Sequence, residues 1–94
     1  GIEEDEVELV LNDFEIVGAG PNPASGSFRI DLSRTVDAVD YHVFDMSGRV
    51  VLTGGFEQCG ASFSIDVSPL GTGVFVLRAA SGNASDAVRF TVLK

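Results

Sequence analysis

The stretch Tyr41-His-Val-Phe-Asp-Met-Ser-Gly-Arg-Val-Val-Leu52 is typical of two strands joined by a tight turn. Asp45 suits the first position of a type I turn, and Gly48 suits the left-handed position that closes it. If Phe44 lies opposite Arg49, one face of the hairpin is apolar and carries Tyr41, Val43, Val50 and Leu52, while the other is mixed and carries His42, Phe44, Arg49 and Val51. The stretch therefore predicts a β-domain, and nothing in it indicates catalysis.

Two further segments on either side of this hairpin alternate strictly between apolar and polar residues. Ser27-Phe-Arg-Ile-Asp-Leu-Ser33 returns 35 residues later as Ser62-Phe-Ser-Ile-Asp-Val-Ser68. Such alternation is typical of strands with one buried and one wet face. We expect both segments to line the same core.

The segment Val74–Ala80 is apolar on both faces except at Arg78, so we expect a central strand that is covered on both sides. Further strands are expected at Val7–Leu11, from Phe14 and Ile16 onward, and at Ala87–Leu93. Breaker residues predict rigid loops at 18–26 and 68–73, a loop at 34–37, and a polar connection that contains Gly54, Gly55 and Gly60.

The expected strands number seven or eight, with turn residues every eight to twelve positions, which is typical of an all-β antiparallel sandwich. Ninety-four residues suffice for one small domain with a modest core.

The net charge of −8 is concentrated at the start of the chain. Residues 1–15 hold seven acids and no base, whereas residues 16–94 hold seven acids and six bases. This balance disfavours nucleic-acid binding. Residues 1–6 are expected to act as a linker or interaction tail, or simply as a solubilising end.

Candidate chemical groups are few. His42 is the only histidine, and Cys59 is the only cysteine and has no base near it in sequence, so neither a catalytic triad nor a zinc site is expected. The aspartates that could bind calcium are scattered, and the triplet Asn83-Ala-Ser matches a glycosylation acceptor of common occurrence. No stretch has the length of a membrane span or the pattern of a signal peptide, and the start is typical of a segment cut from a longer protein.

Four motifs in order resemble the C-terminal sorting domain of the type IX (Por) secretion system: Pro21-Asn-Pro-Ala-Ser-Gly-Ser-Phe28, Val43-Phe-Asp-Met-Ser-Gly-Arg-Val-Val51, Gly73-Val-Phe-Val-Leu-Arg78, and a short last strand ending at Lys94. The resemblance covers about residues 18–94, with residues 1–17 as an acidic linker leading into a first strand that begins near Val7. The chain departs from the family pattern in having Gly20 where an aromatic residue is usual, Phe75 where Tyr is frequent, and Arg89 as the base nearest the terminal motif.

The resemblance implies an immunoglobulin-like sandwich of about seven strands that catalyses nothing and needs no cofactor. It implies that the domain is recognised by an outer-membrane translocon, and that a surface sortase usually removes it and anchors the cargo at the cell surface. It implies no direct membrane insertion. The expected sorting or recognition residues are Pro21, Asn22, Pro23, Gly26, Asp45, Gly48, Arg49, Gly73, Phe75, Leu77, Arg78, Arg89, Val92 and Lys94.

The strand Ala87–Leu93 is the main candidate for recognition, because an edge strand can pair with a strand of a receptor. For Arg49, a pair with Asp45 across the turn competes with receptor contact. For Arg78, a structural pair or an extended surface position competes in the same way. A retained surface adhesion or assembly module is the alternative function, and a carbohydrate-binding module is disfavoured by the absence of Trp.

Overall fold

A computed structural model describes residues 14–94, so the strand expected at Val7–Leu11 lies outside the described residues. The described chain forms five strands: β1 (Ile16–Gly20), β2 (Ser27–Phe44), β3 (Val50–Asp66), β4 (Gly73–Ser81) and β5 (Ala84–Val92). It contains no helix that could span a membrane.

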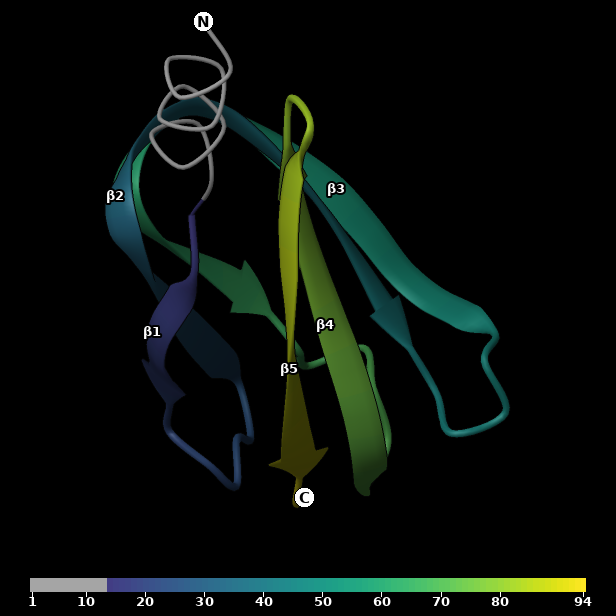
Figure 1. Cartoon of the computed structure of the whole chain (residues 1–94). Coiled ribbons are helices and arrows are strands. Elements are labelled where there is room, and N and C mark those ends of the chain that lie inside the picture. The colour runs from purple at the N-terminus through teal and green to yellow at the C-terminus, as the bar shows by residue number, and fades with distance from the viewer. Residues whose placement is uncertain (1–13) are drawn as a thin grey trace, which may run out of the picture.

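The five strands form one antiparallel sheet that folds over itself into two layers (Figure 1). The first half of β2 pairs with β1 on one side and with the end of β3 on the other. The second half of β2 pairs with β4 and with the beginning of β3, and β5 completes this second layer on the far side of β4. The all-β sandwich expected from the sequence is confirmed, but with five strands rather than seven or eight.

Apart from the strand expected at Val7–Leu11, which lies outside the described residues, the difference in strand number arises because β2 and β3 cross together from one layer to the other (Figure 1). Their pairing shifts register between Asp31 and Val36 and again between Val36 and Ala38. On β3, Gln58 and Gly60 adopt φ of 53° and 78° in the same region. Such bulges bend a strand pair without ending it. The loop expected at 34–37 and the connection expected around Gly54 and Gly60 are therefore parts of strands.

The two alternating segments pair with each other in the first layer, with the β2 segment at its centre and the β3 segment at its edge. Phe28 lies opposite Ile65 and Ile30 lies opposite Phe63, and the buried residues of both segments belong to one core, as expected. The serine of each copy also lies opposite the aspartate of the other, in the pairs Ser27–Asp66 and Asp31–Ser62. The repeat therefore places equal side chains on the two members of one strand pair.

The layers are joined by aromatic packing. The ring of Phe28 on β2 stacks on that of Phe90 on β5 with 4.2 Å between centroids, and Phe75 on β4 packs against Phe90 at 5.9 Å. Phe28 and Phe90 are each 1% exposed. Burial of a large aromatic side chain contributes on the order of 1.5–3 kcal/mol by transfer from water alone, so this cluster is a main reason for the two layers to close.

Strand β1 extends further than the sequence predicted, because Gly18 and Gly20 lie within it and not in the loop. A Cβ atom at Gly18 would approach Oδ2 of Asp31 to 3.1 Å, so a residue without a side chain allows this edge strand to lie close to β2. The rigid loop therefore begins after Gly20.

Candidate functional site

The loop from Pro21 to Gly26, here called the proline loop, lies against the end of β5. The backbone N–H of Ala24 donates to the Thr91 carbonyl at 2.8 Å, and the Leu93 N–H donates to the Ala24 carbonyl at 2.9 Å. Oδ1 of Asn22 accepts from the Thr91 N–H at 3.0 Å. The peptide bonds before both prolines are cis. The proline loop thus supplies partners to backbone groups of β5 that face away from β4.

Lys94 is held at the same end of the molecule. Its backbone N–H donates to Oγ1 of Thr72 at 3.0 Å, and its ammonium group donates to the carbonyl oxygens of Ser25 at 2.8 Å and Ser68 at 3.1 Å. Lys94, two residues beyond the end of β5, therefore connects the proline loop with the segment that precedes β4.

The Asp66 carboxylate, which lies next to the Lys94 contacts, is also stabilised in its charged form. Hydrogen bonds from the hydroxyl and the backbone N–H of Ser68, together with the positive charge of Lys94, hold the pKa of Asp66 below its ordinary value. Because Asp66 ends β3, its hydrogen bonds fix the turn on which the Ser68 carbonyl is presented to Lys94.

Several of the residues expected from the sequence meet at this end of the sandwich. The Gly26 carbonyl accepts from the Val67 N–H at 2.9 Å, and Gly73 lies opposite Val92, which is fully buried. The structure therefore brings together Pro21, Asn22, Pro23, Gly26, Gly73, Val92 and Lys94.

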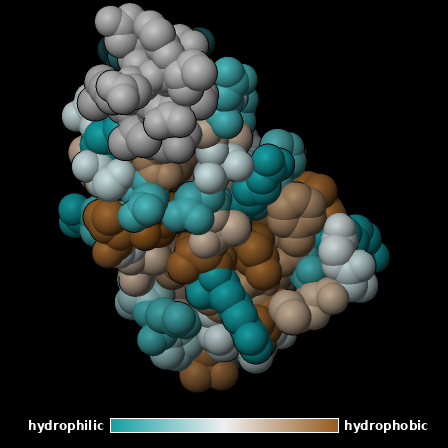
Figure 2. Space-filling view, viewed as in Figure 1, coloured by the Kyte–Doolittle hydropathy of each residue, from teal (hydrophilic) through white to brown (hydrophobic). Residues whose placement is uncertain are grey.

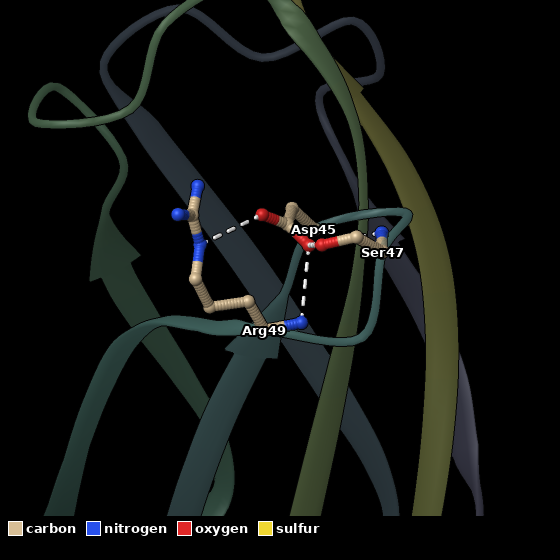
Figure 3. A network of polar contacts seen from close by, with 3 residues as sticks. All are labelled: Asp45, Ser47 and Arg49. Carbon is tan, nitrogen blue, oxygen red and sulfur yellow. Dashed lines mark hydrogen bonds and ion pairs between the residues drawn. The ribbon is translucent and has the colours of Figure 1, made fainter.

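The turn between β2 and β3 lies apart from this group, because β4 stands between β2 and β5. Figure 3 shows how Asp45 organises it: Oδ1 accepts from the N–H and hydroxyl of Ser47 at 2.9 and 2.6 Å and from the Arg49 N–H at 3.1 Å, while Oδ2 accepts from Nε of Arg49 at 3.2 Å. These hydrogen bonds, that of the Ser47 hydroxyl first, lower the pKa of Asp45.

The expected turn and the Asp45–Arg49 pair are confirmed, with Gly48 at φ 87°. The expected register is wrong. Phe44 lies opposite Val50 because the turn already pairs Asp45 with Arg49. A bulge between Val43 and Phe44 then adds one residue to β3, so Val43 lies opposite Leu52 and Tyr41 opposite Gly54. Val50 is consequently 46% exposed and does not share the inner face.

Strand β4 is central, but within residues 14–94 it is covered on one side only, which differs from the expectation. Its inner residues Phe75, Leu77 and Ala79 are buried, whereas no described segment covers the half-buried Val74 and Val76 on its outer face. An apolar outer face has the same sequence pattern whether or not another layer packs on it, so the pattern of β4 alone does not predict a second cover.

Two arginines lie on this outer face of the second layer. Arg78 is exposed and reaches Oγ of Ser85 on β5 at 3.4 Å. Arg89 is exposed on β5, opposite Val76. Figure 2 shows hydrophobic and hydrophilic residues interspersed on the side of the molecule where β5 lies in front. Both arginines are thus available to a partner that approaches β5.

His42 and Cys59, the two residues with catalytic potential, take part in contacts within the fold. His42 is half-buried with its ring 6.3 Å from that of Phe44. Partial burial raises the pKa of the Cys59 thiol, which donates to the Ser62 carbonyl at 3.7 Å. A raised pKa reduces the thiolate fraction needed for nucleophilic attack. Within residues 14–94, no group of three or more His, Cys, Asp or Glu side chains has the geometry of a metal site.

The sequence did not single out Ala24, Ser68, Thr72, Asp86 or Thr91, all of which take part in the contacts around β5. Most of these contacts use backbone groups, and those groups carry no residue-specific pattern. The proline-rich composition of the loop and the family resemblance indicate the loop, but neither names its partner.

A family described as the secretion system C-terminal sorting domain matches residues 20–93, from the residue before the proline loop to the residue after β5. No curated protein sequence matches the chain.

Proposed function

The chain belongs to the family of secretion system C-terminal sorting domains, the sorting signals of type IX secretion cargo proteins, and from this premise we propose how the signal is used. The domain directs its cargo across the outer membrane as a folded module. An outer-membrane translocon reads it, and a surface sortase then removes it and leaves the cargo at the cell surface. The observation that carries this proposal is the family match, which spans the proline loop and β2 to β5.

The structure supports recognition of a folded surface. The end of β5 is fixed through the Asn22, Ala24 and Lys94 contacts, so its exposed groups have defined positions. A receptor that binds a preorganised surface avoids the entropy cost of ordering a loose tail. The domain acts in this scheme as a binding module, since sorting requires recognition by the machinery and no chemical step by the domain.

Fusion of residues 1–94 to a periplasmic reporter tests the proposal. In a cell with a functional type IX system, the fusion should be protease-accessible at the surface, whereas the reporter without the domain should stay in the periplasm. A cell that lacks the translocon should retain both. Periplasmic retention of a folded fusion in the competent cell would contradict the proposed function.

Removal of the domain needs a separate measurement. Intact-mass analysis of the surface reporter should give a mass without the sandwich, residues 14–94. A mass that still includes these residues favours the alternative, a retained surface assembly module. The outer face formed by Phe44, Val74 and Val76, which no segment of residues 14–94 covers, would then offer apolar area for assembly.

A further inference from the structure

The free edge of β5 can be assigned residue by residue. In an antiparallel pair, alternate residues point their backbone groups toward the neighbouring strand and away from it. The contacts of the proline loop with Thr91 and Leu93 identify the outward set. Going back along β5 in steps of two, the same set includes Arg89, Ala87 and Ser85.

The proline loop closes only part of this edge. Thr91 and Leu93, here called the closed stretch, have their outward groups bonded to Asn22 and Ala24. Ser85 to Arg89, here called the open stretch, lie beyond the loop. The Ala87 N–H donates to the adjacent Oδ1 of Asp86 at 2.9 Å, and for the outward N–H and carbonyl of Arg89 there is no partner within residues 14–94.

A groove runs beside the open stretch. It has a volume of about 230 Å³ and lies between residues 16–19 of β1 and Val88 and Arg89 of β5, with Asn22 and Phe28 completing its lining. Oδ2 of Asp86 accepts from the Ile16 N–H at 2.8 Å and so ties the two strands together at one end of the groove. The small residues Gly18 and Ala19 belong to the lining on the β1 side.

The charge beside the open stretch is positive although the chain is acidic. Arg89 is exposed on it, and the Arg78 guanidinium extends toward it through Ser85. The nearest carboxylate on β5, Asp86, lies at one end of this stretch and is engaged by the backbone N–H groups of Ile16 and Ala87. Within residues 14–94 neither Arg78 nor Arg89 forms an ion pair, so an acidic side chain on a partner could pair with Arg89 here.

We propose that the open stretch receives an extended strand of the protein that recognises this domain. The added strand pairs with the backbone of Ser85–Arg89, directs small apolar side chains into the groove beside β1, and carries an acidic residue next to Arg89. Outward backbone groups repeat every second residue along a strand, a pattern that another strand matches and a helix does not. The inference rests on the proposed function and names the mode of recognition.

Arg89→Pro tests this pairing in cells. Proline at an outward position removes an edge donor and leaves the bonds to β4 intact. Ser64→Pro is the matched control: because the Val67 N–H bonds to the Gly26 carbonyl, the register makes Ser64 an outward residue on the opposite edge of the first layer. Surface delivery of the reporter should fall about tenfold or more for Arg89→Pro, as expected for a lost backbone hydrogen bond and a blocked approach. It should stay within about twofold of wild type for Ser64→Pro.

Delivery of folded Arg89→Pro at the wild-type level would overturn the inference, as would an equal loss for the two proline variants. Far-UV circular dichroism and urea denaturation establish that each variant folds. Arg89→Ala keeps the donor and removes the charge, so it should lose less delivery than Arg89→Pro.

An in-vitro arm separates the inference from the proposed function. The probe is the synthetic peptide acetyl-Val-Ala-Val-Asp-Val-amide, titrated to millimolar concentration into the isotope-labelled 94-residue chain. Amide shifts are expected at Ala87 and Arg89 and not at Ser64, and a backbone N-methylated copy of the peptide should cause none. Absence of shifts with the unmodified peptide would contradict strand addition even if the reporter is exported. A failure of wild-type export together with peptide binding would contradict the proposed function alone.

Discussion

The two parts of the β5 edge differ although they belong to one strand. The closed stretch is bonded by a loop that precedes it by about 70 residues in the chain, while the open stretch has exposed side chains at Ser85, Ala87 and Arg89 and a groove beside it. Whether part of an edge strand can pair with a partner therefore does not depend on the strand alone. It depends on whether a distant segment already bonds to the backbone groups of that part.

The open stretch also needs protection from pairing with other copies of the chain. A charged residue on an edge strand opposes such association, and Arg89 occupies this position. The same residue can thus select an acidic partner strand and repel a second Arg89.

The variant with the largest expected effect should destabilise the closed stretch and the open stretch alike. Phe90→Ala deletes the ring that stacks on Phe28 at 4.2 Å and should lower the free energy of unfolding by about 3–5 kcal/mol. Urea denaturation measures this loss. Amide exchange should accelerate in both stretches, because the whole strand depends on this contact. Phe44→Ala on the outer face is the matched control and should cost less than half as much; equal costs would contradict the assignment of the inner face as the main packing surface.

A smaller effect should distinguish the two stretches. Asn22→Ala removes the acceptor of the Thr91 N–H and should cost about 1 kcal/mol, the usual net value of one hydrogen bond. Exchange of the Thr91 amide should accelerate several-fold more than that of Arg89, as measured by NMR. Asn83→Ala, at the exposed tip of the β4–β5 hairpin, should leave both rates unchanged.

Replacement of the Lys94 side-chain ammonium should destabilise the closed stretch less than Asn22→Ala does. Lys94→Met keeps the aliphatic stem and loses the contacts with the Ser25 and Ser68 carbonyls. Since Lys94 is exposed, we expect a loss of roughly 0.5 kcal/mol by urea denaturation. The pKa of Asp66 should rise toward its ordinary value in this variant, and an unchanged carboxyl titration would argue against the charge contribution of Lys94.

The smallest expected effect is a loss of folding stability at acidic pH. Because the folded-state pKa of Asp66 is lowered, its contribution to stability is present above the unfolded value of about 3.9 and is lost as the pH falls through the folded value. Urea denaturation between neutral and strongly acidic pH should show this additional loss in the wild type. Asp66→Asn should lack that component, while the similar contribution of Asp45 remains in both proteins. Parallel pH curves would contradict the prediction.

Local pattern was sufficient for the parts of the fold in which one face is buried and the other is wet. Strict alternation identified the segments around Phe28 and Phe63, and the side-chain chemistry of Asp45 and Gly48 identified their turn. In these cases the determining interactions lie within a few residues or within one strand pair, so the sequence contains them directly.

Features that depend on distant backbone could not be obtained in this way. The bends of β2 and β3 result from bulges in their mutual pairing, and the register error at Val43 has the same origin. The closed stretch results from a loop carbonyl, an N–H group and one Asn side chain. The family resemblance drew attention to the proline loop and the last strand, but their contact required the three-dimensional arrangement.

The position of the proline loop has a consequence for the order of folding. The β2–β3 and β4–β5 hairpins are closed by short turns and can form early, whereas the contact of Asn22 with Thr91 joins residues 69 positions apart. Closing so long a loop has an entropy cost that nearby contacts must first offset. The closed stretch should therefore form late, after the two hairpins have docked. The division of the β5 edge would then exist only in a domain that has finished folding, so a receptor that reads it would reject immature chains.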